Sequence, residues 1–276
     1  MSVVETERHD GIFVIRMNRP ERLNALGTEL RAALAEAWVE FRDSRELEVA
    51  IYTGTGRAFC VGEDMKESVE RGTVGSGGGG GGGGPARENP YMTGEIQKPI
   101  IAAINGFAMG GGFMLAERAD LRVAVHKAVF EMSEAKRWLL GGFNHGHING
   151  LSHTVATEMA FAIRFDADRL YELGFLNRVV DDDQLMPVSF EMAEHLMTLP
   201  PAARVNTLVM MRAMRPPVPE ELLELADRLR QHGAKTDLME SRRAFAEKRK
   251  PNFIGWDDPE DRYRTPTLES LRGTAV

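Results

Sequence analysis

Three consecutive glycines, Gly110 to Gly112, are the residues of this sequence best suited to binding an anion. They lie between a short apolar run, Ile100–Ile104, and a helix-compatible segment, Phe113–Arg118. Glycines at the point where a strand leads into a helix leave backbone N–H groups exposed at the positive end of the helix dipole. Such N–H groups can bind a phosphate or stabilise an oxyanion that forms during a reaction. The alternative is that the glycines only permit a tight turn or close strand–helix packing.

A second glycine-containing turn lies upstream, in Thr53–Met65 (TGTGRAFCVGEDM), after an apolar strand predicted over Val49–Thr53. Together the two segments resemble the signature segments of the crotonase, or enoyl-CoA hydratase/isomerase, superfamily. Three further motifs add to the resemblance: NRPERLNAL (Asn18–Leu26), SEAKRWL (Ser133–Leu139) and FAEKRKPNF (Phe245–Phe253). The resemblance extends over roughly residues 3 to 255, with the motifs in the order of the family.

The resemblance implies an oxyanion hole. In the family, a coenzyme A thioester carbonyl binds between two backbone N–H groups, one from each signature segment, and the matching positions here are Val61 and Gly111. Two such donors would stabilise the enolate that forms when a proton moves at the carbon next to the thioester. Because this chemistry uses the backbone, a valine in place of the family's usual alanine is compatible with it, although it narrows the pocket.

The acid/base residues implied by the resemblance are incomplete. Hydratases of the family use two glutamates, and the position of the first is Met114, whose thioether has no useful basicity. The second aligns with Glu134, and an apolar pocket with Trp138 one helical turn on would raise the pKa of this carboxyl towards neutrality. The alternative for Glu134 is a charge at a helix N-terminus. Glu117, one turn after Met114, is either a displaced second acid or an exposed helix charge.

The loop that follows the second glutamate is glycine-rich in the family and here reads GGFNHGHINGLSH. Asn144 or a histidine such as His145 could reach the acyl pocket as a polar specificity group. His145, His147 and His153 also suggest a metal, but His-x-His spacing without a nearby carboxylate is weak evidence. We expect no metal, and no cofactor other than the coenzyme A that forms part of the substrate.

Coenzyme A contacts are also implied by the resemblance. Arg22 and Leu23 lie in the segment that lines the CoA groove in the family. Phe245 and Lys248 match an aromatic residue and a lysine that contact the adenine and the phosphates, often from a neighbouring subunit. A lysine suits a phosphate as a point charge. The alternative for Lys248 is a solvated helix end, because it begins the basic run 248–250.

The elements that position these residues show alternating strands and helices. Val3–Arg8 and Ile12–Met17 flank a glycine-containing loop and predict a β-hairpin. Thr28–Arg42 carries apolar residues at helical spacing. With a strand at Val49–Thr53 and a short helix at Met65–Arg71, the order predicts βα units on a shared sheet. The resemblance implies more: an α/β, crotonase-like spiral of repeated ββα units that forms two roughly perpendicular sheets.

The C-terminal region is predicted to be helical, over Ser189–Leu199, Ala202–Met214, Glu220–Gly233 and Thr236–Lys248. We divide the chain into an α/β core with the oxyanion hole (1–188), a helical region for oligomerisation and CoA capping (189–255) and a polar tail of little periodicity (256–276). The glycine run at 75–84 offers no side chain to bury and is expected to be a flexible, flap-like connector. Apolar residues of the C-terminal helices predict burial against a neighbouring chain, in a homotrimer or a dimer of trimers: Met192, Leu196, Leu208, Met211, Leu222, Leu225 and Leu229.

Composition narrows the functional class. The 276 residues carry a net charge of −7, which argues against binding to nucleic acid or to an anionic membrane. No apolar run approaches the ~18 residues of a membrane span, and the N-terminus lacks the features of a signal peptide. A single cysteine, Cys60, excludes an intrachain disulfide and fits the cytoplasm. Cys60 is expected to be a small buried residue and not a nucleophile.

These observations predict an enzyme that acts on an acyl-CoA thioester through an oxyanion-stabilised enolate, with Glu134 as the acid/base. The acyl group is not specified. A single glutamate favours isomerisation, since moving a double bond needs only one base, whereas hydration ordinarily uses both carboxylates. A specialised lyase, hydrolase or decarboxylase is an alternative. A catalytically inactive crotonase-fold protein for binding or assembly is the rival, favoured by Met114 and the altered 141–153 loop.

Overall fold

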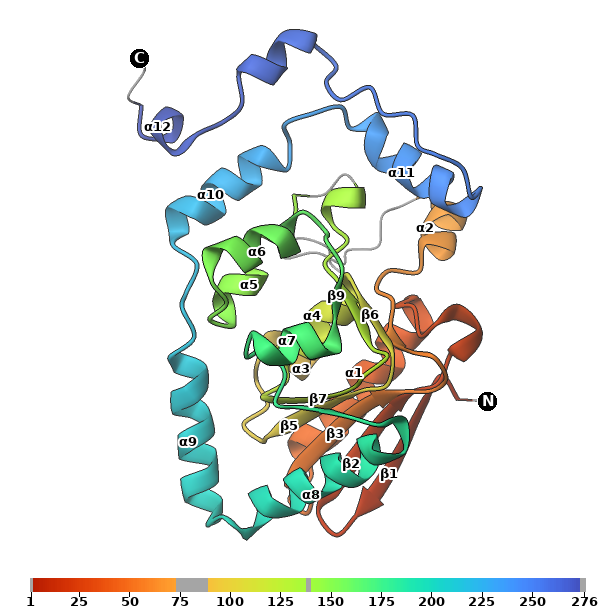
Figure 1. Cartoon of the computed structure of the whole chain (residues 1–276), viewed down its shortest axis with the longest axis vertical. Coiled ribbons are helices and arrows are strands. Elements are labelled where there is room, and N and C mark those ends of the chain that lie inside the picture. Colours follow the sequence, from red (N-terminus) through yellow and green to blue (C-terminus); the bar gives the residue numbers. More distant parts are fainter. Residues whose placement is uncertain (1, 73–88, 138–139, 274–276) are drawn as a thin grey trace. The chain divides into compact units, whose positions relative to one another are not determined.

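The sheets of this protein are built around fully buried strands. A computed structural model describes residues 2–72, 89–137 and 140–273 (Figure 1). All residues of β3 (Val49–Gly54) and of β5 (Ile100–Ile104) are buried. Parallel strands that are covered on both faces are rich in apolar residues and show no alternation of apolar and polar residues. The predicted connector at 75–84 lies outside the described residues.

Two sheets are formed by the described strands. The larger sheet has the order β1 (Val4–His9), β2 (Ile12–Met17), β3, β5, β7 (Leu121–Val125) and β10 (Arg178–Val180). The smaller has the order β4 (Ala58–Cys60), β6 (Phe107–Met109), β8 (Val129–Glu131) and β9 (Phe165–Asp166). All pairs are parallel except β1 with β2 and β8 with β9.

The expected repeat of two strands and a helix is confirmed. β3 and β4 precede α2 (Met65–Arg71), and β5 and β6 precede α4 (Gly111–Arg118). β7 and β8 precede a one-turn 3₁₀ helix, Ala135–Arg137. Each repeat gives one strand to each sheet, so that successive repeats advance one place in both sheets. The smaller-sheet strands were not predicted, because their two or three residues are too few to show an apolar period.

The N-terminal hairpin and the helix after it follow the sequence pattern. β1 and β2 pair from Val4 opposite Met17 to His9 opposite Ile12. The loop between them is Asp10-Gly11, and both residues have positive φ, as a two-residue hairpin turn requires. Helix α1 (Thr28–Asp43) buries its predicted apolar face: Leu30, Leu34, Trp38 and Phe41.

Aromatic side chains fill the space between α1 and the two sheets. Trp38 stacks on Tyr91, with ring centroids 4.4 Å apart, and meets the edge of Tyr52 in β3 at 5.2 Å. Tyr52 in turn contacts Phe59 of β4, also at 5.2 Å. Offset and edge-to-face contacts of this kind contribute beyond the burial of area. This cluster joins the larger sheet to the smaller one.

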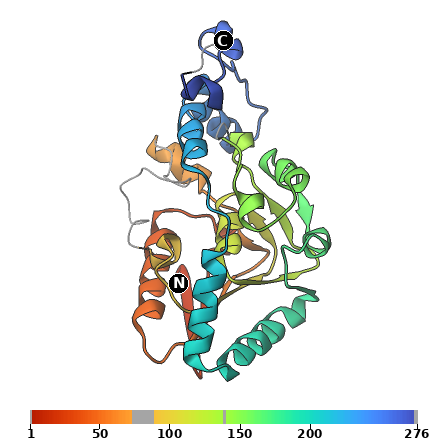
Figure 2. The same ribbon diagram turned by 90° about the vertical axis from the view of Figure 1, so that its left-hand side faces the viewer.

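Helix α8 (Leu185–Thr198) packs against β3, β5 and β7. Its predicted start at Ser189 was wrong, because the helix includes Pro187. Proline is tolerated in the first turn, where the N–H groups have no acceptor within the helix. The chain then turns at Leu199–Pro200 into α9 (Pro201–Ala213), as Figure 2 shows.

The described part of the chain contains no helix long and apolar enough to cross a membrane.

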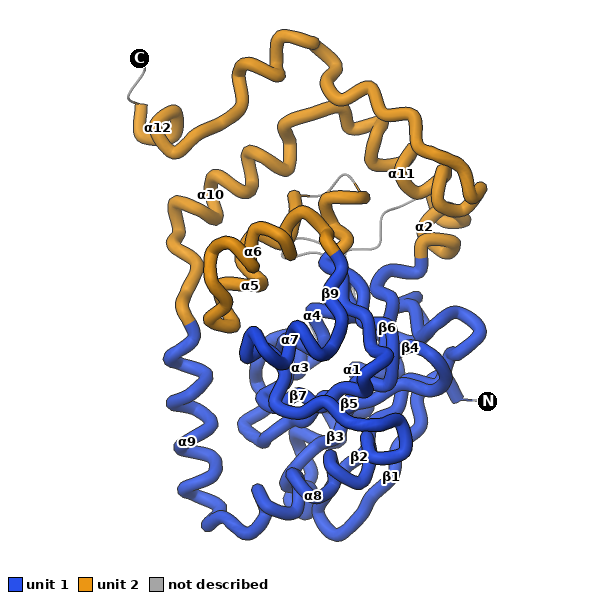
Figure 3. Tube along the Cα trace, in the orientation of Figure 1, with its two compact units in different colours: residues 1–64, 75–132, 164–215 blue, residues 65–74, 133–163, 216–276 orange. Residues whose placement is uncertain are grey.

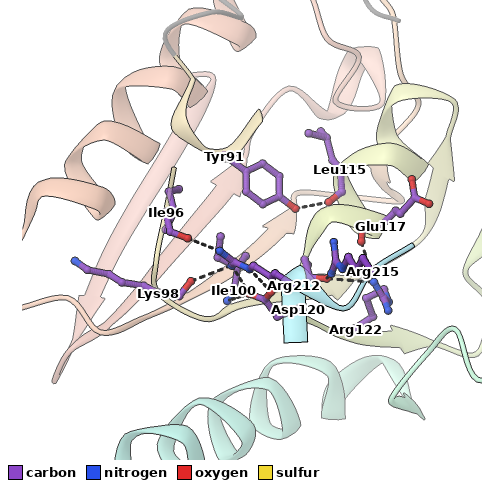
Figure 4. A network of polar contacts seen from close by, with 11 residues as sticks. Tyr91, Ile96, Lys98, Ile100, Leu115, Glu117, Asp120, Arg122, Arg212 and Arg215 are labelled. Atoms are coloured by element: carbon purple, nitrogen blue, oxygen red, sulfur yellow. Dashed lines mark hydrogen bonds and ion pairs between the residues drawn. The ribbon is translucent and has the colours of Figure 1, made fainter. Parts of the chain in front are cut away.

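Arg212 of α9 connects this helix to the start of β5 (Figure 4). Its Nε and NH2 groups donate to both carboxylate oxygens of Asp120, at 2.8 and 2.7 Å. Asp120 also accepts the N–H of Ile100, at 2.9 Å, and Arg212 donates to the carbonyl of Ile96. A bidentate, partly buried pair of this kind holds the two elements in one geometry.

The backbone divides into two units (Figure 3). Unit 1 contains the described residues of 1–64, 75–132 and 164–215, including both sheets and helices α1, α3 (Pro90–Thr93), α4, α7 (Ala167–Glu172), α8 and α9. Unit 2 contains those of 65–74, 133–163 and 216–276. The predicted division into regions 1–188, 189–255 and 256–276 concerns function and stays a prediction.

The helices of unit 2 are short: α2, α5 (His145–Ile148), α6 (His153–Ala160), α10 (Glu220–Leu229), α11 (Thr236–Ala246) and α12 (Leu268–Leu271). Helix α10 ends four residues before the predicted Gly233. The tail, which shows little periodicity in the sequence, contains α12 and a 3₁₀ helix at Pro259–Tyr263. Thr267 caps α12 through a reciprocal capping box with Ser270, a local signal independent of apolar period.

Candidate active site

The first signature segment turns sharply after β4. Gly62 has φ +83°, a conformation that side chains disfavour. The N–H of Leu26 donates to the carbonyl of Gly62 at 2.7 Å, and Leu26 forms a parallel bridge with Glu63. Because Gly62 and Asp64 make the two bonds of this bridge, the N–H of Glu63 points away from Leu26. Val61 and Glu63 are the residues on either side of Gly62. Because its N–H points away from Leu26, Glu63 is an alternative to the predicted oxyanion donor Val61.

The second signature segment is the junction of β6 and α4. Gly110 has φ +49° and donates its N–H to the carbonyl of Glu131 at 2.7 Å. The first helical bond is that from the N–H of Met114 to the carbonyl of Gly110, at 3.1 Å. The N–H groups of the first turn, beginning with Gly111, have no acceptor within the helix. Gly110 provides no side-chain cap. This helix N-terminus can therefore receive an anion.

The two segments approach each other so closely that glycine is required. A Cβ atom on Gly62 would lie 2.8 Å from the carbonyl oxygen of Met109 and 2.9 Å from the nitrogen of Gly111. A Cβ on Gly112 would lie 1.9 Å from the carbonyl oxygen of Cys60. These neighbours are backbone atoms, which cannot move aside as a side chain can. Gly111 is different, since its Cβ would meet only the Leu26 side chain, at 3.2 Å, and Gly62 Cα, at 3.5 Å.

Two polar residues that the sequence analysis did not single out hold the first segment in place. Asn24 is fully buried, accepts the N–H of Arg19 at 2.8 Å, and donates to the carbonyl of Ala58 at 2.8 Å. Asp64 is 4% exposed and pairs with Arg19 at 2.8 Å. The sequence signal that could have indicated this pair is an aspartate two residues after the glycine of the turn, together with an arginine in the preceding motif.

Helix α4, which begins at Gly111, is fixed at its C-terminal carbonyls (Figure 4). The Tyr91 hydroxyl donates to the carbonyl of Leu115. Arg122 donates to the carbonyls of Glu117 and Ala119, at 2.9 and 3.1 Å. Burial lowers the pKa of Arg122 to about 10. A cation at this end of a helix also interacts favourably with the dipole.

Met114 and Glu117 lie on α4 in unit 1. Met114 is partly exposed. Glu117 is buried, which contradicts its interpretation as an exposed helix charge. Its carboxylate raises the pKa of Arg122 against the larger effect of burial, so Glu117 acts as an electrostatic partner within unit 1. No observation tests a role for it as a displaced second acid.

Glu134 lies in unit 2 at the start of the 3₁₀ turn Ala135–Arg137, and its carbonyl accepts the N–H of Arg137 at 2.9 Å. The side chain of Glu134 is partly buried. Trp138, the predicted apolar neighbour, lies outside the described residues. The assignment of Glu134 as the acid/base stays a prediction.

The altered loop packs on α6. A Cβ on Gly141 would lie 2.3 Å from the carbonyl oxygen of Ala160, and one on Gly146 would lie 2.6 Å from the Cβ of Ala156. Gly141 and Gly146 therefore serve close packing, whereas a Cβ on Gly150, at φ +73°, would meet no atom within 4 Å. Asn144 is the N-cap residue of α5 without making a side-chain cap, and His145 begins the helix, both partly exposed.

His147 and His153 stack on each other, with ring centroids 5.4 Å apart. Within the residues that the structure describes, no group of three or more His, Cys, Asp or Glu side chains could hold a metal ion. The predicted specificity roles of Asn144 and His145 are untested.

The predicted CoA contacts lie in both units. Arg22 and Leu23 are partly exposed in unit 1, and Arg22 lies 3.8 Å from Asp64. Phe245 of α11 is 48% exposed, and Lys248, just past the helix, is exposed with φ +55°. Cys60 is fully buried, and burial raises the pKa of its thiol to about 12, so that it is not a nucleophile at neutral pH.

Comparison with known proteins identifies the family. The model of the enoyl-CoA hydratase/isomerase family matches residues 7–256. The enoyl-CoA hydratase EchA19 of Mycobacterium tuberculosis is 32% identical over 256 residues, which cover 90% of this chain and 94% of that protein. The 1,2-epoxyphenylacetyl-CoA isomerase of Escherichia coli is 29% identical over 272 residues, covering 92% and 99%.

Solved structures show the same fold. The crystal structure of carnitinyl-CoA hydratase from Mycobacterium avium has a TM-score of 0.75 to this chain at 26% identity, and the match covers 92% of this chain and 99% of that one. The matched family model, the relatives and the shared fold agree over nearly the whole chain. This protein therefore belongs to the enoyl-CoA hydratase/isomerase family and is an enzyme of that kind with the crotonase fold.

Proposed function

We propose that this enzyme transforms an acyl-CoA thioester through an enolate whose oxygen is held by two backbone N–H groups. One donor is Gly111, and the other lies beside Gly62, with Val61 predicted and Glu63 as the alternative. The observation that carries the proposal is the contact of the two segments, in which a Cβ on Gly62 would lie 2.9 Å from the nitrogen of Gly111. Preorganised donors of this kind stabilise charge that develops in the transition state.

Glu134 is the proposed acid/base. Its carboxylate would take a proton from the carbon next to the thioester carbonyl, and the electron pair of the C–H bond would move into the enolate. Return of the proton to another carbon would shift a double bond without any second base. Met114 provides no carboxylate at the position of the first hydratase glutamate, and this favours isomerisation over hydration. A specialised lyase, hydrolase or decarboxylase reaction is the alternative.

A panel of acyl-CoA thioesters tests the proposal. The purified protein is incubated with each thioester, and mass and absorbance are followed, with binding measured by calorimetry. We expect binding of at least one thioester and a turnover that Glu134→Gln abolishes. Absence of binding by every thioester at millimolar concentration would refute the proposal. Turnover that is unchanged in Glu134→Gln would remove Glu134 from the mechanism, and binding without any turnover would favour the inactive binding protein.

The remaining coenzyme A contacts are proposed from the resemblance. Arg22 and Leu23 would line the CoA groove, while Phe245 and Lys248 would approach the adenine and the phosphates. The proposed acyl-pocket residues are Met114, Trp138, Asn144 and His145. The proposed location is the cytoplasm, supported by the single, buried Cys60. No cofactor beyond the coenzyme A of the substrate is proposed.

A homotrimer or a dimer of trimers is the proposed assembly. Apolar side chains are exposed at the C-terminal end of α9 and at its C-cap residue: Met210 and Met211 are 60% exposed, and Met214 is 70% exposed. Exposed apolar surface gathered at one helix end supports burial against a second copy. Light scattering at micromolar concentration should give the mass of three or six chains, and the mass of one chain of 30.6 kDa would contradict the proposal.

A further inference from the structure

Helix α11 contacts the turn that contains Glu134, and both belong to unit 2. The guanidinium carbon of Arg137 lies over the ring of Phe245, 4.5 Å from its centroid. The hydroxyl of Ser241 donates to the carbonyl of Lys136, at 3.4 Å. Ser241 and Phe245 are four residues apart and thus share one face of α11. This face holds the turn at two consecutive residues.

The turn is short, because its 3₁₀ helix has three residues. The N–H of Arg137 donates to the carbonyl of Glu134, at 2.9 Å, and closes it. A 3₁₀ turn of three residues gains little stability from such a bond. Packing against residues 135–137 therefore helps to fix the position of Glu134 within unit 2, and α11 packs against them.

The N-terminal half of helix α11 is bonded to the segment that follows the helix. Asp237 is buried and accepts the N–H groups of Ile254 and Gly255, at 3.0 and 2.8 Å. Glu240 accepts Arg249, at 2.8 Å, and hydrogen bonds from Arg249 hold the pKa of Glu240 at about 2. α11 also packs against α2, which begins directly after the first signature segment. These contacts join α11 to α2 and to the segment after the helix.

We infer that Phe245, with Ser241, is a positioning residue for Glu134: the stack of Phe245 on Arg137 fixes the turn from which the carboxylate extends. The inference rests on the proposed role of Glu134. It assigns Phe245 a task within its own chain, which differs from contact with the adenine of coenzyme A. The two roles make different demands on the substrate, because only the adenine contact needs a nucleotide.

Truncated substrates separate the two roles. Turnover is measured with the active acyl group carried by coenzyme A and by N-acetylcysteamine, which lacks the nucleotide. Phe245→Leu keeps an apolar side chain but removes the aromatic face. A cation–π contact at a partly exposed site corresponds to about a two- to fivefold effect, and we expect kcat to fall by this factor with both thioesters. Phe245→Tyr, which keeps the ring, should restore kcat.

A matched control is Phe253→Leu. Phe253 is 46% exposed, close to the 48% of Phe245, and no cation lies over its ring among the described residues. Its kcat should equal that of the unmodified protein. If Phe245→Leu raises only the KM of the coenzyme A thioester and leaves turnover of the truncated thioester unchanged, Phe245 is a nucleotide contact and the inference is wrong.

Amide hydrogen exchange tests the same inference without activity. Phe245→Leu should speed exchange in a peptide covering 133–137 about two- to fivefold, while Phe245→Tyr and Phe253→Leu should leave it unchanged. Unchanged exchange in Phe245→Leu would overturn the inference. Failure of the proposed function is distinguished from failure of this inference by turnover, which then survives Glu134→Gln or is absent from the unmodified protein. In either case the hydrogen-exchange result still decides whether Phe245 holds the turn.

Discussion

Gly62→Ala is the substitution that tests the contact between the two signature segments most directly. An alanine at φ +83° has left-handed strain of about 1–2 kcal/mol. Its Cβ would also lie 2.8 Å from the carbonyl oxygen of Met109 and 2.9 Å from the nitrogen of Gly111. Overpacking against atoms that cannot rotate away adds about 1–3 kcal/mol. We therefore expect a total destabilisation of about 2–5 kcal/mol.

Gly174→Ala provides the matched control. Gly174 has φ +78°, close to that of Gly62, but a Cβ there would meet no atom within 4 Å. This variant should therefore show the strain alone, about 1–2 kcal/mol. Urea unfolding of both variants is measured under the same conditions. The difference between them isolates the contact of Gly62 with the second segment.

Activity should separate the two variants more strongly than stability does. Relief of the contact in Gly62→Ala must move the backbone of Met109 or Gly111, and thus a proposed oxyanion donor. Loss of one such donor lowers kcat about 10²–10³-fold. Gly174→Ala should keep the kcat of the unmodified protein. Equal stability of the two variants, or a kcat of Gly62→Ala within about threefold of the unmodified protein, would refute the reasoning.

Three further results are expected. The unmodified protein should hydrate crotonyl-CoA about 10²–10⁴ times more slowly than an enzyme with both acid/base groups, and Met114→Glu should partly restore hydration. Hydration is measured by absorbance. Fast hydration by the unmodified protein that survives Glu134→Ala would show that the site is formed by other residues. Cys60, whose pKa burial raises to about 12, should react with a thiol reagent at pH 8 only after unfolding, and rapid labelling of the folded protein would contradict its burial. Hydrogen bonds from Arg249 hold the pKa of Glu240 at about 2, below its ordinary 4.5, so the stabilising effect of Glu240 is fully present above about pH 4.5 and is lost as the pH falls towards 2. In Glu240→Gln the midpoint of unfolding should therefore depend less on pH across this range. An unchanged pH dependence in the variant would show that the Glu240–Arg249 pair does not stabilise the protein.

Local patterns in the sequence were sufficient for the larger elements. Ile100–Ile104 is an apolar run between turn signals, and it forms β5 with those bounds. Leu30, Leu34, Trp38 and Phe41 at helical spacing form the buried face of α1. In both cases the apolar pattern reflects the burial that stabilises the element. The pattern therefore predicts the element without knowledge of the segments that pack against it. Helix ends were less accurate, as at Pro187 in α8, because the first turn tolerates a residue that the interior excludes.

The order of the motifs determined the family and the class of enzyme, since both depend on residues that can be recognised from the sequence alone. Only the tertiary structure decided why Gly62 and Gly112 must be glycines, because the atoms that exclude a Cβ belong to segments roughly 50 residues away in the sequence. It also decided that Glu117 is buried beside Arg122, and that Phe245 lies under Arg137. Each of these facts is a distance between residues remote in the chain, and the local period of a sequence contains no information about such distances.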